Sequence, residues 1–309
     1  MATVGKQNST NVRKYFKLLA VRAGFALGSL FAPRHAADRA ARLFATPFAS
    51  SRSRARQATP DAEMHCEPVR VGKQTIATYV WGDPATQPYV LLAHGWSSFG
   101  LRFQPWVARL RAAGYAVITF DQPGHGASSG DLCTLPEFVD TVRAVGSRFG
   151  NAALAIAHSL GGAAMALAQN EHWRADRIVL IAPSVDIGAA VGRFFRFAHV
   201  SERLRPLFYA WHTRRTGVDP ATLEIHRIVQ ALAQPCLVVH DLDDRDVPWD
   251  EGERYARFWP QARLLTTTGL RHNRIVDDPG VMAQVLRFAA GETVGEHVVS
   301  TSNLPFGMA

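Results

Sequence analysis

The feature that most constrains the fold is an alternation of two hydrophobic patterns that begins near residue 69. Short apolar runs rich in β-branched residues, the pattern of buried strands, alternate with longer runs whose apolar residues recur every three or four positions, the pattern of helices. The alternation predicts strands over 75–80, 89–93, 116–120, 153–157, 177–181, 236–240 and 263–266, and helices over 103–113, 135–149, 160–170, 249–258 and 279–290. It indicates an α/β fold in which a mostly parallel central sheet carries helices on both faces.

Two of the predicted helices carry start signals. Thr134 and Glu137 have the spacing of a capping box before the helix at 135. Asp278 stands directly before Pro279 at the start of the last helix.

Between 184 and 228 the alternation stops. This stretch is rich in aromatic residues and arginine, and an insertion of such length in a compact domain usually has structure of its own. We therefore predict a small helical cap over about 185–228, inserted in a domain of 64–292 that is followed by a flexible tail over 293–309. The underside of such a cap would form the roof of an apolar substrate pocket.

The formal net charge of +8 is unevenly distributed. Residues 1–60 hold 11 of the 34 lysines and arginines but only one acid, Asp38, and so carry +10. The remaining 249 residues hold 23 basic and 25 acidic residues and so carry −2. The basic surplus therefore belongs to an N-terminal extension over 1–63, and the near-neutral body argues against a nucleic-acid partner.

The extension contains an amphipathic stretch over 12–31 whose apolar residues at 12, 16, 19, 23, 26, 27 and 30 fall on one helical face. Two interpretations stay open: the helix lies on an anionic membrane surface, or it packs this stripe on the body and leaves its cations in solvent. No apolar run reaches the roughly 18 residues of a membrane-spanning helix. Arg22 interrupts the apolar run that a short signal peptide would need.

The three cysteines, Cys66, Cys133 and Cys236, stand far apart and form no CxxC pair. This spacing argues against a zinc site and against a disulfide framework. It favours a reducing, cytoplasmic location, with membrane association through the extension as the alternative to free solution. Nothing in the sequence indicates the oligomeric state.

The sharpest chemical motif is Ala-His-Ser-Leu-Gly-Gly at 157–162, placed where an apolar strand ends and a helix-forming run begins. Ser159 would lie on a tight strand-to-helix turn, with its hydroxyl exposed at the N-terminus of the helix. Small neighbours at positions 157, 161 and 162 let the backbone fold sharply. The alternative is a serine that merely caps the helix.

A serine hydroxyl needs a base and an acid partner to act as a nucleophile near neutral pH. The segment 241–246 is dense in carboxylates and follows one predicted strand, and His272 follows the next. Because ligands of open α/β sheets bind at the carboxyl ends of the strands, we expect these groups to meet Ser159 at one sheet edge. As alternatives, the carboxylates could form a solvated turn or bind a divalent cation, and His272 could be a loop histidine.

These motifs resemble those of the α/β-hydrolase-fold serine hydrolases, a group that includes esterases, lipases and serine aminopeptidases. The resemblance covers roughly residues 64–290 and rests on five segments in the family's order: His94-Gly95-Trp96, 121–128, the turn at Ser159, 244–248 and His272. It implies an α/β-hydrolase fold. Two departures are Ala157, where the family usually has Gly, and Asp241, where Gly commonly follows the histidine that ends the strand.

The resemblance implies that Ser159 is the nucleophile and that His272 is the general base and later the general acid. It implies that Asp244 orients the imidazole, because Asp244 stands three residues before Val247-Pro248 as in the family pattern. Asp243 is the second candidate for this acid.

The resemblance places an oxyanion hole at the backbone N–H groups of Trp96 and Leu160. His94, His125 and His158 are expected to brace loops around the site and not to act as bases. The triad implies neither a cofactor nor a metal. We therefore expect a small-molecule acyl substrate and hydrolysis of a carboxylic ester through an acyl-enzyme. Alternatives are an acyltransferase, an amidase or peptidase that uses the same triad, and a non-catalytic binding protein that has kept the fold.

Overall fold

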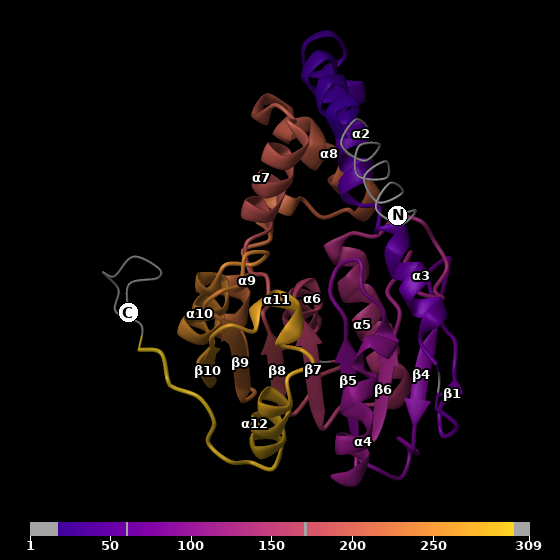
Figure 1. Cartoon of the computed structure of the whole chain (residues 1–309), viewed down its shortest axis with the longest axis vertical. Helices are drawn as coiled ribbons and strands as arrows, with labels where there is room; N and C mark the ends of the chain where they lie inside the picture. Colours follow the sequence, from indigo (N-terminus) through magenta and orange to yellow (C-terminus); the bar gives the residue numbers. More distant parts are fainter. Residues whose placement is uncertain (1–17, 60, 170–171, 300–309) are drawn as a thin grey trace, which may run out of the picture. The chain divides into compact units, whose positions relative to one another are not determined.

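The computed structural model describes residues 18–59, 61–169 and 172–299. The chain forms two compact units: one comprises the segment up to Ala45 together with Asp186–Leu223, and the other comprises Thr46–Val185 and the chain from Glu224 onward. The predicted N-terminal extension is therefore divided at residue 45 between the two units. Most of the predicted insertion falls in the first unit, whose helices are α2, α7 and α8 in Figure 1.

The second unit is built on an eight-stranded sheet with the order β1-β4-β6-β5-β7-β8-β9-β10 (Figure 1). The pairs from β6 through β10 are parallel, whereas β1 with β4 and β4 with β6 are antiparallel. The strands span His65–Cys66 (β1), Thr78–Trp81 (β4), Tyr89–Ala93 (β5), Ala116–Phe120 (β6), Leu154–His158 (β7), Ile178–Ile181 (β8), Cys236–Asp241 (β9) and Ala262–Thr267 (β10). The predicted mostly parallel sheet is confirmed.

Helices pack on both faces of this sheet, as predicted. The α-helices of the unit are Ala49–Gln57 (α3), Gln104–Ala112 (α4), Leu135–Phe149 (α5), Leu160–Ala168 (α6), Ile225–Ile228 (α9), Trp249–Phe258 (α10), Arg271–Arg274 (α11) and Pro279–Ala289 (α12), with short 3₁₀ turns at Gly100–Phe103 and Val229–Ala231. Side chains of α4 and α12 share one core with Val90 and Leu92 of β5. Tyr89, which points to the other face of β5, donates its hydroxyl proton to backbone carbonyls of α5 and of the residue after it.

The predicted strand over 75–80 is wrong in one respect, because the chain breaks at Ala77 into β3 (Gln74–Ile76) and β4. β3 pairs with β2 (Val69–Val71) in a separate hairpin. The backbone of Ala77 bonds to the loop after β6 instead: its N–H donates to Ser128 Oγ at 2.9 Å, and its carbonyl accepts from Asp121 N–H at 2.9 Å. The break thus fastens the loop that the motif at 121–128 occupies.

One of the two predicted helix start signals is corrected. Thr134 does not cap α5 with its side chain; its hydroxyl donates to Glu137 Oε2 at 2.8 Å. At α12 the signal holds, because Asp278 Oδ1 accepts from Val281 N–H at 2.9 Å.

Helix α3 belongs to the second unit, although its arginine-rich sequence lies within the predicted extension. Arg52 donates to the carbonyls of Gly124 and Gly130, and Arg54 donates to the carbonyl of Ser97 at 2.7 Å. These arginines hold the loops after β5 and β6. At the other end of the chain, Glu296 pairs with Leu264 of β10, so the predicted tail is anchored before residue 299.

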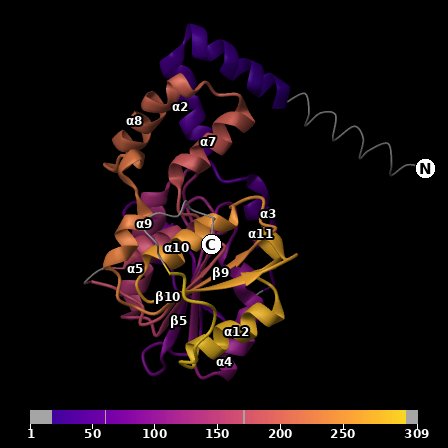
Figure 2. The same ribbon diagram turned by 90° about the vertical axis from the view of Figure 1, so that its left-hand side faces the viewer.

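The first unit is helical (Figure 2). It contains a helix over 18–31, α2 (Pro33–Phe44), α7 (Ile187–Ala198) and α8 (Arg205–Thr216), with 3₁₀ turns at Glu202–Leu204 and Pro220–Thr222. Four alanines of α2 are buried, and Phe44 at its end belongs to a cluster of aromatic rings with Phe194, Phe195 and Phe208. No helix in the described part of the chain is both long enough and apolar enough to cross a membrane.

Candidate active site

Ser159 lies on the turn between β7 and α6, where the sequence motif placed it. Its backbone has φ of +56°, a conformation that L-residues rarely adopt outside sharp turns. Its N–H donates to the carbonyl of Ile181 on the neighbouring strand β8 at 3.0 Å. The side chain makes no capping hydrogen bond to α6, so the interpretation of Ser159 as a simple N-cap fails.

The small residues around this turn are required by close backbone approaches. A Cβ at Gly161 would lie 2.5 Å from the carbonyl oxygen of His94, and one at Gly162 would lie 2.9 Å from Cβ of Pro183. Ala157 lies in the extended strand β7 and does not have a positive φ. Alanine in place of the usual glycine therefore costs this turn nothing in backbone conformation.

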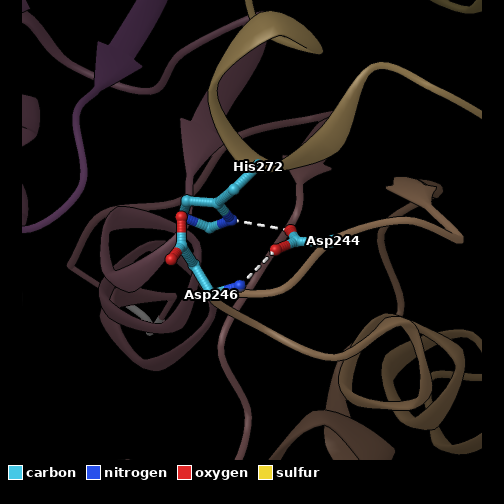
Figure 3. A group of neighbouring side chains, drawn as sticks. All are labelled: Asp244, Asp246 and His272. Carbon is cyan, nitrogen blue, oxygen red and sulfur yellow. Dashed lines mark hydrogen bonds and ion pairs between the residues drawn. The ribbon is translucent and has the colours of Figure 1, made fainter.

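His272 lies on the short helix α11, which follows β10. Its Nε2 is 3.0 Å from Ser159 Oγ, and its Nδ1 is 2.7 Å from Asp244 Oδ2 (Figure 3 shows the second of these contacts). In the tautomer that fits both contacts, Nδ1–H donates to the carboxylate and Nε2 accepts the serine proton. The structure thus brings together the three residues that the sequence placed after three separate strands.

The carboxylate of Asp244 is held on both sides. Oδ1 accepts the backbone N–H groups of Asp246 at 2.9 Å and Val247 at 3.0 Å, and Oδ2 faces His272 (Figure 3). Burial opposes ionisation of this carboxyl, but hydrogen bonds from His240 and His272 outweigh it and hold its pKa well below the usual value. Asp244 is therefore a fixed anion beside the imidazole.

The two neighbouring carboxylates serve the loop that carries His272. Asp241 Oδ2 accepts from Thr267 Oγ1 at 2.7 Å and from Leu270 N–H at 3.0 Å. Asp243 Oδ2 accepts from Gly269 N–H at 2.8 Å. Asp243, the second candidate for the triad acid, thus bonds a backbone amide of the loop and not the imidazole. Asp241, the departure from the family pattern, fastens the same loop.

Two further histidines hold His272 and Asp244 in position. His158 Nε2 lies 2.9 Å from the backbone carbonyl oxygen of His272. As the donor to this carbonyl, the ring of His158 holds the backbone of His272 in place. Burial holds the pKa of His158 well below its usual value, so the ring is neutral and acts as a brace, as predicted. His240 Nε2 lies 3.0 Å from the carbonyl of Val247 and 3.4 Å from Asp244. Nothing in the sequence indicates this role of His240 beyond its position at the end of a strand.

The proposed oxyanion donors lie on two segments that meet at Ser159. Leu160 is the first residue of α6, so its N–H is one of the free amides of a helix N-terminus. The loop that carries Trp96 passes close by, because a Cβ at Gly95 would lie 2.8 Å from Cβ of Ser159. Within the described residues, no hydrogen bond is formed by the N–H of Trp96 or of Leu160.

His94 and His125 brace that loop, as predicted. His94 Nε2 accepts the backbone N–H of Gln122 at 3.0 Å, and His125 Nε2 accepts that of Ser97 at 3.0 Å. The Nδ1–H of each ring donates to a nearby backbone carbonyl. Burial lowers the pKa of His94 to about 4; burial and the neighbouring His94 lower that of His125 to about 3. Both rings are thus neutral at ordinary pH.

A divalent cation is the alternative use of this loop, since oxygen or nitrogen atoms of Asp244, Asp246 and His272 lie within 4.8 Å of one another. Such an ion would have to replace the hydrogen bond between Asp244 and His272. The carboxylate of Asp244 already accepts three donors, which fit an oriented imidazole better than a metal ligand.

The sheet order, the turn from β7 into α6 and the position of Ser159, Asp244 and His272 after three strands are those of an α/β-hydrolase fold. Residues 84–231 match the family model described as serine aminopeptidase, S33. The match includes Ser159 and ends before Asp244 and His272, so those two positions rest on the geometry alone.

This chain also matches solved structures of the same fold, and each match covers nearly the whole of the solved chain. A hydrolase from Pseudomonas aeruginosa PA01 is 20% identical, with a TM-score of 0.58, and the match covers 75% of this chain and 100% of that one. An esterase from Rhodococcus sp. ECU1013 is 22% identical, with a TM-score of 0.53 and coverage of 74% and 98%. A 2-hydroxy-6-oxo-6-phenylhexa-2,4-dienoate hydrolase from Rhodococcus sp. strain RHA1 is 16% identical, with a TM-score of 0.56 and coverage of 74% and 99%. The predicted resemblance is confirmed at the level of the fold.

Proposed function

We propose that the protein is a serine hydrolase that cleaves a carboxylic ester through an acyl-enzyme. The observation that carries this proposal is the chain of contacts from Ser159 Oγ to His272 and on to Asp244, at 3.0 and 2.7 Å. Such a chain can remove the serine proton as the nucleophile attacks and return it to the leaving group.

In the acylation step, Ser159 Oγ attacks the ester carbonyl while His272 Nε2 takes the hydroxyl proton. Asp244 stabilises the resulting imidazolium. The negative charge on the former carbonyl oxygen is stabilised by the N–H groups of Trp96 and Leu160, each worth roughly 10²- to 10³-fold in rate. The tetrahedral intermediate then expels the alcohol, which receives the proton from His272.

In the deacylation step, His272 removes a proton from water, and the hydroxide so formed attacks the acyl-enzyme. The second tetrahedral intermediate releases the carboxylic acid, and Ser159 regains its proton from His272. No group outside the chain is needed, because each proton that leaves a reactant passes to Nε2 and returns to a product.

The proposal is tested by steady-state hydrolysis of p-nitrophenyl esters of increasing acyl length. We expect turnover by the wild type and a loss of at least about 10⁴-fold in Ser159→Ala. Ser50→Ala, which removes an exposed hydroxyl on α3, should keep the wild-type rate. Hydrolysis by Ser159→Ala at the wild-type rate would contradict the assignment, and inactivity of the wild type on every ester would point to other substrates or to a binding protein.

A second candidate is cleavage of an amide or peptide bond by the same residues. It is favoured by the match of residues 84–231 to the serine aminopeptidase family model. Amino-acid p-nitroanilides, assayed beside the esters, separate the two: a higher kcat/KM on the anilides would assign the protein to the peptidases. Acyl transfer to an alcohol would appear as a new ester when the acceptor competes with water.

A further inference from the structure

The helix over 18–31 exposes the apolar stripe that its sequence predicts. The residues at 19, 23, 26, 27 and 30 follow the spacing of one helical face, and all five are exposed. Leu30 is 71% exposed and Phe31, which follows it, is 81% exposed. The described residues of this stripe are therefore open to solvent, which favours the interpretation in which the helix lies on a membrane surface; Val12 and Phe16 lie outside the described part of the chain.

The opposite face of the same helix packs within the first unit. Phe25 is fully buried, with the guanidinium of Arg39 over its ring at 5.1 Å. A Cβ at Gly28 would lie 3.1 Å from Cβ of Ala36, so the helix is in close contact with α2. The packing of Phe25 and Gly28 thus holds the leucine stripe outward.

The exposed apolar surface continues onto α7 and is bordered by cations. Phe197, which is itself exposed, lies beside Arg22: the guanidinium is 5.4 Å from the ring centroid, and Nε donates to the Phe197 carbonyl at 2.9 Å. Across 18–45 and 186–223 the unit holds ten arginines and four acids, a formal charge of +6. Two of those acids, Asp38 and Glu202, are paired with arginines.

We propose that this surface, formed by Leu19, Ala23, Ala26, Leu27, Leu30, Phe31 and Phe197, docks on an anionic membrane. Leucine and phenylalanine side chains can enter the region between headgroups and acyl chains, while the arginines remain at the level of the lipid phosphates. The charge of +6 matches such a surface. The same charge disfavours self-association through this face, because a second copy would present an equally positive surface.

Co-sedimentation of the full chain with vesicles tests this proposal. We expect binding to vesicles of equal parts phosphatidylglycerol and phosphatidylcholine, weakening with added salt, and little binding to phosphatidylcholine alone. Leu30→Glu should weaken binding by about tenfold or more, because it places a charge where an apolar side chain must enter the bilayer. Val299→Glu is the matched control, since Val299 is 70% exposed and belongs to the second unit.

A second variant guards against an effect of misfolding. Arg34, three residues after Phe31, and Arg196, directly before Phe197, are both exposed. The double variant Arg34→Gln with Arg196→Gln leaves the apolar stripe intact and should weaken binding to the anionic vesicles and reduce its salt dependence. Ser159→Ala should bind as the wild type does, so the test does not depend on catalysis. The proposal is overturned if the wild type ignores anionic vesicles, if Leu30→Glu binds like Val299→Glu, or if Leu30→Glu instead converts a dimer to monomers without any vesicle binding.

Discussion

Three carboxylates crowd the loop after β9, and their different partners assign them different roles. Asp244 accepts from the imidazole of His272, whereas Asp241 and Asp243 accept from the backbone of the loop that carries His272. In the proposed mechanism Asp244 supplies the charge that stabilises an imidazolium, and Asp241 and Asp243 hold the loop that positions the ring. Substitution of each carboxylate can measure these different roles.

Asp244→Asn should lower kcat by about 10³- to 10⁴-fold, because an amide disfavours the tautomer in which Nδ1 carries the proton. Asp243→Asn should cost at most about tenfold, since its amide oxygen can still accept from Gly269 N–H. Steady-state kinetics on one ester substrate compares them. If Asp243→Asn is the more damaging of the two, the acid of the triad has been assigned to the wrong residue.

At this scale the sequence predicted which residues meet but not how they are held. Ser159, Asp244 and His272 could be predicted because each follows a strand of a parallel sheet, and such strand ends share one edge. The supporting contacts of His158 and His240 depend on side-chain directions across separate loops, for which no spacing rule exists. The choice of Asp244 over Asp243 depended on the family pattern, and the hydrogen bond between His272 and Asp244 supports it.

The turn from β7 into α6 requires glycine at 161 because the helix starts against the loop after β5. Gly161→Ala would place a Cβ 2.5 Å from the His94 carbonyl oxygen and should lower the free energy of unfolding by roughly 1–3 kcal/mol, as overpacking does. Gly192→Ala on α7 is the control: its Cβ would meet a flexible arginine at 3.4 Å, and alanine favours a helix. Urea unfolding curves check both, and equal midpoints for the two variants would contradict the steric account.

Among the elements, long periodic helices were predicted best. The predicted ranges 135–149 and 249–258 coincide with α5 and α10. The break at Ala77 was missed because it depends on bonds to Ser128 and Asp121, far along the chain. Helix α3 was missed for a related reason: its Ser-Arg alternation carries no apolar stripe, and tertiary bonds from Arg52 and Arg54 hold it in place.

At the scale of the whole molecule, buried neutral histidines make folding stability depend on pH. An unfolded histidine takes up a proton near its ordinary pKa of 6.5, whereas His94 in the folded protein does so only at about 4. Stability is therefore full above about pH 6.5 and is lost as the pH falls toward 4, with a slope of up to about 1.4 kcal/mol per pH unit from this residue. His125 adds a similar contribution with a folded pKa of about 3.

Urea unfolding of wild type and His94→Gln, repeated across this pH range, measures the effect. In the variant the free energy of unfolding should decline less steeply as the pH falls, whatever its absolute stability. The difference in slope should correspond to the uptake of up to one proton fewer on unfolding. An unchanged slope would mean that His94 is protonated in the folded protein or that its loop is open.

The fold divides the basic residues of the N-terminal extension between the two units. The sequence analysis assigned the basic surplus to an N-terminal extension, and Arg52 and Arg54 of that extension brace loops of the second unit. The arginines at 22, 34, 39 and 42 lie in the first unit, which has an exposed apolar face. Composition could locate the charge along the chain, and only the packing could show which cations are engaged in the fold.

The central claim, that Ser159 is an activated nucleophile, is tested most directly by intact-mass spectrometry after treatment with a fluorophosphonate. The account predicts one covalent adduct on the wild type, located by peptide mapping at Ser159, and none on Ser159→Ala. It also predicts much slower labelling of His272→Ala, in which the base is lost. An adduct that forms on Ser159→Ala as fast as on the wild type, or a folded wild type that never reacts, would contradict it.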